Sequence, residues 1–269
     1  MSVIFHVKSN VFQLDGKDFT YLIGIYDNRF LTTLYYGKKI EILHPERLQV
    51  TRELGFSPSP SEYFYKRNVS LDTLPQEYPS FGYGDFRIPA IMVEQENGSR
   101  IVDLRFKSYE ILAEKPKIEG MPSLLEDESC DSLKITLKDE LTNVEVDLYY
   151  NVYGERNVLT RHCVIKNLGN QKINITKAMS CSLDLRDSKF NFLELKGTHC
   201  EERHIEITPL RHGISKIESR RCSSSHMLNP FMALCRKDAT EDFGEVYGFN
   251  LVYSGNYEGT IEVDQRNTT

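Results

Sequence analysis

The feature that most constrains the fold of this 269-residue chain is a two-residue alternation of apolar and polar side chains. The alternation is clearest at 133–138, 144–152 and 179–186. Such a period is typical of an antiparallel strand with one buried face. Further apolar, β-branched runs that favour strands lie at 3–7, 20–26, 30–36, 101–112, 158–166, 231–235, 246–253 and 260–264.

Turn sequences separate these runs, and long helical patterns are rare. Typical turn residues stand at 27–28, 96–98, 168–170 and 254–256. Together they predict an all-β fold, a large antiparallel β-sandwich with few short helices. One short helix is predicted at 45–54, and no βαβ rhythm indicates a Rossmann fold or a TIM barrel within these residues.

Composition excludes several classes of function. The formal net charge is −6, and no basic stripe suggests nucleic-acid binding. No apolar run approaches the roughly 20 residues that a membrane-spanning helix needs. The first residues lack the pattern of a secretory leader. The six cysteines are scattered without a C-x-x-C pair, which favours reduced thiols and a cytoplasmic location.

The sequence shows no catalytic or metal-binding constellation. Glycoside hydrolysis needs two acids across a cleft, whereas Asp103, Asp147 and Glu262 occupy strand-like positions that we interpret as solvated faces. A zinc site needs three or four convergent ligands. Pro209 interrupts the strand on which His204 and His212 would share a face.

Nucleophile and phosphate motifs are missing as well. The run from Ser223 to His226 lacks the G-x-S-x-G turn of a hydrolase nucleophile, and no P-loop sequence occurs. We therefore predict no catalytic residue, no metal and no cofactor in this chain.

The segment 74–89, LPQEYPSFGYGDFRIP, fits neither a helical nor a strand period. Its three prolines and two glycines predict a loop. On extended backbone, Asp85 and Arg87 point one way and Phe86 the other. The carboxylate accepts and the guanidinium donates hydrogen bonds to sugar hydroxyls, and the rings of Tyr83 and Phe86 offer apolar faces. The alternative is that Asp85 and Arg87 pair with neighbours and only pin the loop.

A second dense patch of charge runs from Arg203 to Phe231, hereafter the Arg203–Phe231 region. Cations packed so closely on β structure need acidic partners, in this domain or in another. The region is therefore a candidate interface, whose basic residues are Arg203, His204, Arg211, Arg220 and Arg221.

Four ordered strings carry a specific resemblance. They are SLDTLPQEYPSFGYGDFRIPA, ERHIEITPLRHGI, ESRRCSSSHMLNPF and EVYGFNLVYSGN. They resemble the N-terminal β domain of bacterial α-galactosidases of glycoside hydrolase family 36, and the similarity extends from about residue 26 to the end.

The resemblance implies a fold and a context. In that family the N-terminal domain is a supersandwich of the galactose-mutarotase type. It precedes a catalytic (β/α)8 barrel, whose two aspartates act by a retaining mechanism, and a small C-terminal β domain. Neither aspartate motif occurs here, and the sequence ends just after a strand-like run. We expect residues 1–269 to form a single N-terminal domain that lacks the barrel and the C-terminal domain.

The resemblance also implies a role. The full-length enzyme is expected to be a tetramer that releases terminal α-D-galactosyl residues from melibiose or raffinose. The N-terminal domain of such tetramers reaches the active-site mouth of a neighbouring subunit. The positions that match the contributing loop best are Tyr83, Asp85, Phe86 and Arg87. In a chain without the barrel, Asp85 and Arg87 are expected to be exposed and to have few partners.

We therefore expect a non-catalytic domain that serves assembly and shapes the substrate entrance. The alternative is an autonomous carbohydrate-binding module, which usually exposes a platform of Trp or Tyr. The chain contains no tryptophan, which disfavours the module. A complete small β enzyme is the least favoured possibility, because no catalytic constellation is seen.

Overall fold

The computed structural model describes residues 2–51, 58–63 and 69–269. Within them the chain forms sixteen strands and two short 3-10 helices, and every strand pair is antiparallel. The predicted all-β class is confirmed. Contacts group the chain into two compact units. The first unit is Met1–Pro116 with Leu124–Asp184, and the second is Lys117–Ser123 with Leu185–Thr269.

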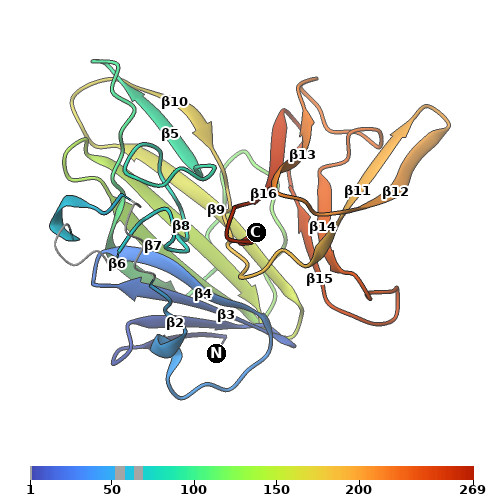
Figure 1. Ribbon diagram of the computed structural model, residues 1–269, viewed down its shortest axis with the longest axis horizontal. Helices are drawn as coiled ribbons and strands as arrows, with labels where there is room; N and C mark the ends of the chain where they lie inside the picture. The colour runs from blue at the N-terminus through green and yellow to red at the C-terminus, as the bar shows by residue number, and fades with distance from the viewer. Residues whose placement is uncertain (1, 52–57, 64–68) are drawn as a thin grey trace. The chain divides into compact units, whose positions relative to one another are not determined.

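The first unit holds two four-stranded meanders (Figure 1). One contains β1 (Val3–His6), β2 (Val11–Asp15), β3 (Phe19–Tyr26) and β4 (Phe30–Lys38). The other contains β6 (Arg105–Leu112), β7 (Cys130–Lys138), β8 (Val144–Tyr153) and β9 (Val158–Asn167). A two-stranded sheet pairs β5 (Ile91–Gln95) with β10 (Ile173–Ala178).

Alternation explains how these sheets share one core. On β8, Val146, Leu148 and Tyr150 are buried in the same apolar cluster as Tyr21 and Ile23 of β3. These residues are two apart on each strand, so they point to one face of each sheet. Burial of this apolar area is the main contribution that drives the two meanders together.

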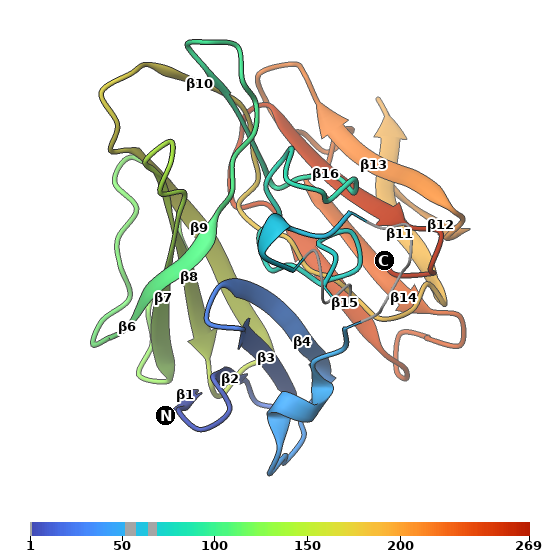
Figure 2. The same cartoon turned by 60° about the vertical axis from the view of Figure 1, so that its left-hand side comes forward.

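The second unit is also built from sheets, seen from another side in Figure 2. Its four-stranded sheet has the order β12-β11-β14-β15, and a two-stranded sheet pairs β13 with β16. Phe190, Phe192 and Leu234 are buried in this unit, as are Ile261 and Val263. The strand bounds are β11 (Phe190–Thr198), β12 (Glu201–Pro209), β13 (Gly213–Ser219), β14 (Phe231–Arg236), β15 (Val246–Asn250) and β16 (Tyr257–Val263).

Two local predictions were wrong or incomplete. The alternating segment 179–186 is not a strand. Its carbonyls are used instead by distant groups: the Arg161 guanidinium donates to Ser182 O at 2.6 Å. The helix predicted at 45–54 is only the 3-10 helix η1 (Pro45–Leu48), and residues 52–54 of that prediction lie outside the described residues. The second 3-10 helix, η2, is Ser61–Tyr63.

Candidate functional site

The 74–89 loop belongs to the first unit and leads into β5, in the teal part of the chain in Figure 1. Its start runs beside β4: Thr33 N donates to Pro75 O at 2.8 Å, and Glu77 N donates to Leu31 O at 3.0 Å. Gly82 then adopts φ +99°, a conformation that side-chain-bearing residues rarely take. The loop is therefore fixed by main-chain contacts at its start, and Gly82 permits its turn further on.

Glu77 provides a first buried anchor. Its side chain is 0% exposed and forms an ion pair with Arg161 Nη2 at 2.6 Å. Three hydroxyls also donate to the carboxylate, from Tyr21 at 2.6 Å, Thr33 at 2.6 Å and Tyr150 at 2.8 Å. A buried charge is tolerated when it is paired and fully hydrogen-bonded. The loop is thus tied at Glu77 to both meanders of the first unit.

The electrostatics of this anchor keep the two phenols protonated. Burial, with the Glu77 charge beside it, raises the pKa of Tyr21 well above its ordinary value. The same two causes raise the pKa of Tyr150. Both hydroxyls therefore remain donors to Glu77 over the whole physiological range, and neither is suited to accept a proton.

Arg87 provides a second anchor near the end of the loop. Its Nε donates to Asp85 Oδ1 at 3.0 Å, and its Nη2 donates to Asp85 Oδ2 at 2.8 Å. Its Nη1 donates to Asp184 Oδ2 at 2.7 Å. The Gln76 amide donates to Asp85 as well, at 2.8 Å. Arg87 Nη2 also reaches two carbonyls, Leu74 O at 2.7 Å and Leu71 O at 3.2 Å.

Two carboxylates share one guanidinium at this anchor. Burial raises the pKa of Asp184 to about 6, against the opposing effect of Arg87, and the Asp85 charge adds to the rise. Burial also lowers the pKa of Arg87, but Asp184 and Asp85 more than offset this, so the guanidinium stays charged. The Arg87 guanidinium is therefore a fixed cation that contacts two carboxylates, those of Asp85 and Asp184.

The expectation that Asp85 and Arg87 are exposed was wrong. The exposed fraction of the side chain is 2% for Asp85 and 13% for Arg87. Their partners lie in the first unit itself, so no residue from elsewhere is needed to pair them. Phe86 instead is 77% exposed. Tyr83 is half-buried, with the Arg105 guanidinium 5.2 Å from its ring centre.

The Arg203–Phe231 region lies in the second unit and is differently built. Arg203, His204, Arg211, Arg220 and Arg221 are all exposed. Arg220 pairs with Glu218 at 3.1 Å, a contact within one exposed strand end. Among the described residues, Arg203, Arg211 and Arg221 form no ion pair.

The other candidates do not converge on a site. Asp147 is only 1% exposed, so its interpretation as a solvated strand residue was wrong. It pairs with Lys166 at 2.5 Å and accepts from Thr136 at 2.7 Å. His204 is on β12, which ends at Pro209 as predicted, whereas His212 precedes β13.

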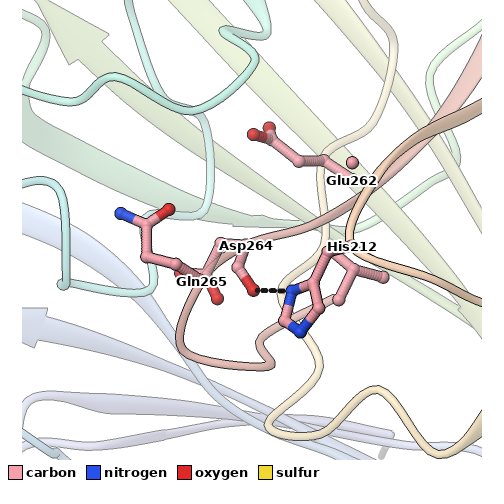
Figure 3. Close-up of a pocket in the computed structure, with 6 residues that line it drawn as sticks. His212, Glu262, Asp264 and Gln265 are labelled. Atoms are coloured by element: carbon pink, nitrogen blue, oxygen red, sulfur yellow. Dashed lines mark hydrogen bonds between the residues drawn. The ribbon is translucent and has the colours of Figure 1, made fainter.

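His212 lines an open surface pocket with Glu262, Asp264 and Gln265 (Figure 3). Its Nδ1 contacts Asp264 O at 3.0 Å. The Asp264 carboxylate accepts from the main chain of Arg266 and Thr268, so it serves the terminal turn. His212 and Asp264 are therefore already engaged with the main chain of the protein.

Two absences can be stated for the part of the chain that the structure describes. No group of three or more His, Cys, Asp or Glu side chains in it could hold a metal ion. No helix in it has the length and apolar character required to cross a membrane.

Fold and site together define a class: a β-sandwich domain whose charged loop is tied internally and presents an aromatic side chain. Residues 29–269 match the glycosyl hydrolase family 36 N-terminal domain. The chain belongs to that family.

Known relatives agree in sequence and in fold. The chain is 39% identical over its whole length to α-galactosidase AgaA of Geobacillus stearothermophilus, of which it covers 37%. It is 40% identical to the bifunctional α-galactosidase/sucrose kinase AgaSK of Mediterraneibacter gnavus, and covers 29% of that protein. The crystal structure of α-galactosidase AgaB from G. stearothermophilus matches with a TM-score of 0.93, at 40% identity, over 100% of this chain and 36% of that one. The chain thus spans little more than a third of these relatives at most.

Sequence reasoning missed three residues of the anchors: Glu77, Arg161 and Asp184. Glu77 follows Gln76 in a predicted loop, where charged residues are common, so it gave no signal. Arg161 lies in a strand-like run, where a single cation is expected to face solvent. Asp184 was assigned to the polar face of a strand that does not form. The only available signal was the density of prolines around Glu77, which marked a loop that had to be held in place.

Proposed function

We propose that this chain is the non-catalytic N-terminal part of an α-galactosidase, where it supports assembly and shapes the entrance to the active site. The observation that carries the proposal is Phe86, an exposed aromatic side chain on a doubly anchored loop in a chain of this family. A rigid exposed aromatic is a typical contact for a partner or a ligand, because little conformational freedom is lost on binding.

The substrate is an α-galactoside, and the catalytic groups lie on a barrel outside these residues. A variant of AgaA has been solved in complex with raffinose. We assign Phe86 and Tyr83 to contact with the substrate or with the barrel rim, and Asp85 and Arg87 to holding them. In the proposed tetramer this rim belongs to a neighbouring subunit.

The Arg203–Phe231 region is the proposed docking surface. Its exposed cations leave charge available for acidic groups on another domain or subunit, and such groups tune recognition more than folding. All six cysteines are free thiols, which supports the proposal that the enzyme works in the reducing cytoplasm.

The proposal is tested with the chain by itself. We expect no hydrolysis of a nitrophenyl α-galactoside, and no heat on calorimetric titration with raffinose or galactose. Turnover by the chain would refute the non-catalytic assignment. Binding of either sugar by the chain would favour the second candidate, an autonomous carbohydrate-binding module.

A further inference from the structure

The second anchor of the loop joins two segments that are far apart in sequence. Arg87 lies on the loop, while Asp184 lies 97 positions away on the irregular segment after β10. Asp85 and Asp184 hold the guanidinium from two sides, at 2.8 and 2.7 Å. A bidentate carboxylate contact fixes the orientation of a guanidinium as well as its position.

Phe86 stands between Asp85, which is buried, and Arg87, which is largely buried. Its own main-chain N donates to Asp72 Oδ1 at 3.3 Å, while its side chain is 77% exposed. The ring cannot move away with its backbone unless the contacts of Asp85 and Arg87 break. An exposed ring of this kind is held in place by groups that never touch its ligand.

We infer that Asp184 and Arg87 are positioning residues, whose ion pair fixes the place of Phe86 at the substrate entrance and thereby the preference for oligosaccharides over small galactosides. The inference rests on the proposed function. Asp184 touches no substrate; it acts through Arg87 on the backbone of Phe86. A displaced contact far from the reacting atoms can reduce turnover strongly, and a contacting group must be held by its supporting residues.

The ring's mobility can be measured in the chain without any substrate. The chain contains no tryptophan, so Phe86→Trp introduces a single tryptophan at the position of interest, which can be excited selectively beside the 15 tyrosines. Time-resolved anisotropy at neutral pH is compared for this reporter alone and with Asp184→Asn or Arg87→Lys. We expect a nanosecond depolarising component to grow in both double variants, because the backbone at residue 86 gains freedom.

Asp147→Asn is the matched control. Like Asp184, Asp147 is an aspartate of the first unit that pairs with one cation, here Lys166, but it is buried and lies on β8. The Asp147→Asn substitution should lower the melting temperature without changing the anisotropy decay of the Trp reporter at position 86. Decays that are identical in all four proteins, each folded by circular dichroism, would overturn the positioning role. Arg87→Lys keeps the charge and serves if Asp184→Asn does not fold.

The second measurement uses the full-length enzyme and the ratio of kcat/KM for raffinose to that for a nitrophenyl α-galactoside. Phe86→Ala and Asp184→Asn should each lower this ratio, on the order of tenfold. The double variant should be no worse than Phe86→Ala, because both changes act on one contact. An unchanged ratio in Phe86→Ala overturns the proposed function at this loop. A changed ratio in Phe86→Ala with an unchanged ratio in Asp184→Asn overturns the positioning role alone.

Discussion

In the 74–89 loop Glu77 and Asp85 are buried, Arg87 is largely buried, and all three are paired within the chain. The basic residues named above in the Arg203–Phe231 region are exposed instead and, apart from Arg220, form no ion pair among the described residues. Glu77 is 0% exposed and accepts from four side chains. Arg220 is 78% exposed, and its one carboxylate partner is two residues away. Charges of the first kind hold the fold together, so their removal must be felt in folding. Charges of the second kind cost little to leave in water, so their removal should hardly affect folding.

The sharpest way to break this comparison is to remove the charge of Glu77. Glu77→Gln leaves the Arg161 guanidinium buried without its counter-charge, and should lower the free energy of unfolding by about 3–5 kcal/mol. Urea denaturation followed by circular dichroism measures the change. The control, Glu218→Gln, removes a half-exposed carboxylate that pairs with Lys216 and Arg220, and should give no measurable change. Equal effects of the two substitutions would contradict the distinction.

The sequence predicted the parts of the fold that depend on one local pattern. Strands β7 and β8 were anticipated from the alternation, although every residue of β8 except Tyr149 is buried, its polar face included. The segment 179–186 has the same alternation, yet its partners are the side chains of Arg161 and Arg87 in place of a neighbouring strand. Period alone cannot distinguish these two environments.

The anchors of the loop could not be predicted for a related reason. Glu77 meets Tyr21 and Tyr150, which are 56 and 73 positions away. These pairings follow from how the two meanders face each other, which no local pattern encodes.

A smaller effect is expected from the titration of Asp184. Its pKa is raised to about 6 in the fold, whereas an unfolded aspartate has about 3.9. The folded chain therefore binds this proton more tightly. The carboxyl's stabilising contribution is fully present below about pH 4 and is lost as the pH rises through about 6.

Comparison with Asp184→Asn isolates this one carboxyl from the others that titrate in the same range. As the pH rises from about 4 through about 6, the free energy of unfolding of the chain should fall relative to that of Asp184→Asn, by on the order of 2 kcal/mol. Urea titrations at several pH values measure it. A difference that does not change with pH would show that the Asp184 carboxyl has an ordinary pKa.

The rates at which the cysteine thiols are modified compare the second unit with the surroundings of the anchors, and this measurement requires no change in stability. Cys200 and Cys222 are exposed in the second unit, whereas burial raises the pKa of Cys163 and Cys181 near the anchors. The thiolate is the reactive form. A chromogenic disulfide reagent should therefore modify two thiols rapidly and the rest only in denaturant, and Cys222→Ser should remove one of the rapid two. Rapid modification of Cys181 would mean that the loop opens readily.

The smallest effect on folding is expected in the Arg203–Phe231 region. Arg220→Ala and Arg221→Ala should leave the melting temperature of the chain unchanged, because surface substitutions away from buried partners are nearly neutral. In the full-length enzyme the same changes should weaken domain docking or tetramer formation, seen as a lower mass by light scattering. Lys8→Ala, another exposed cation, is the control and should not change the mass. An unchanged mass and melting temperature of the full-length Arg220 and Arg221 variants would remove this region as the docking surface, and would leave its exposed cations as ordinary solvated charge.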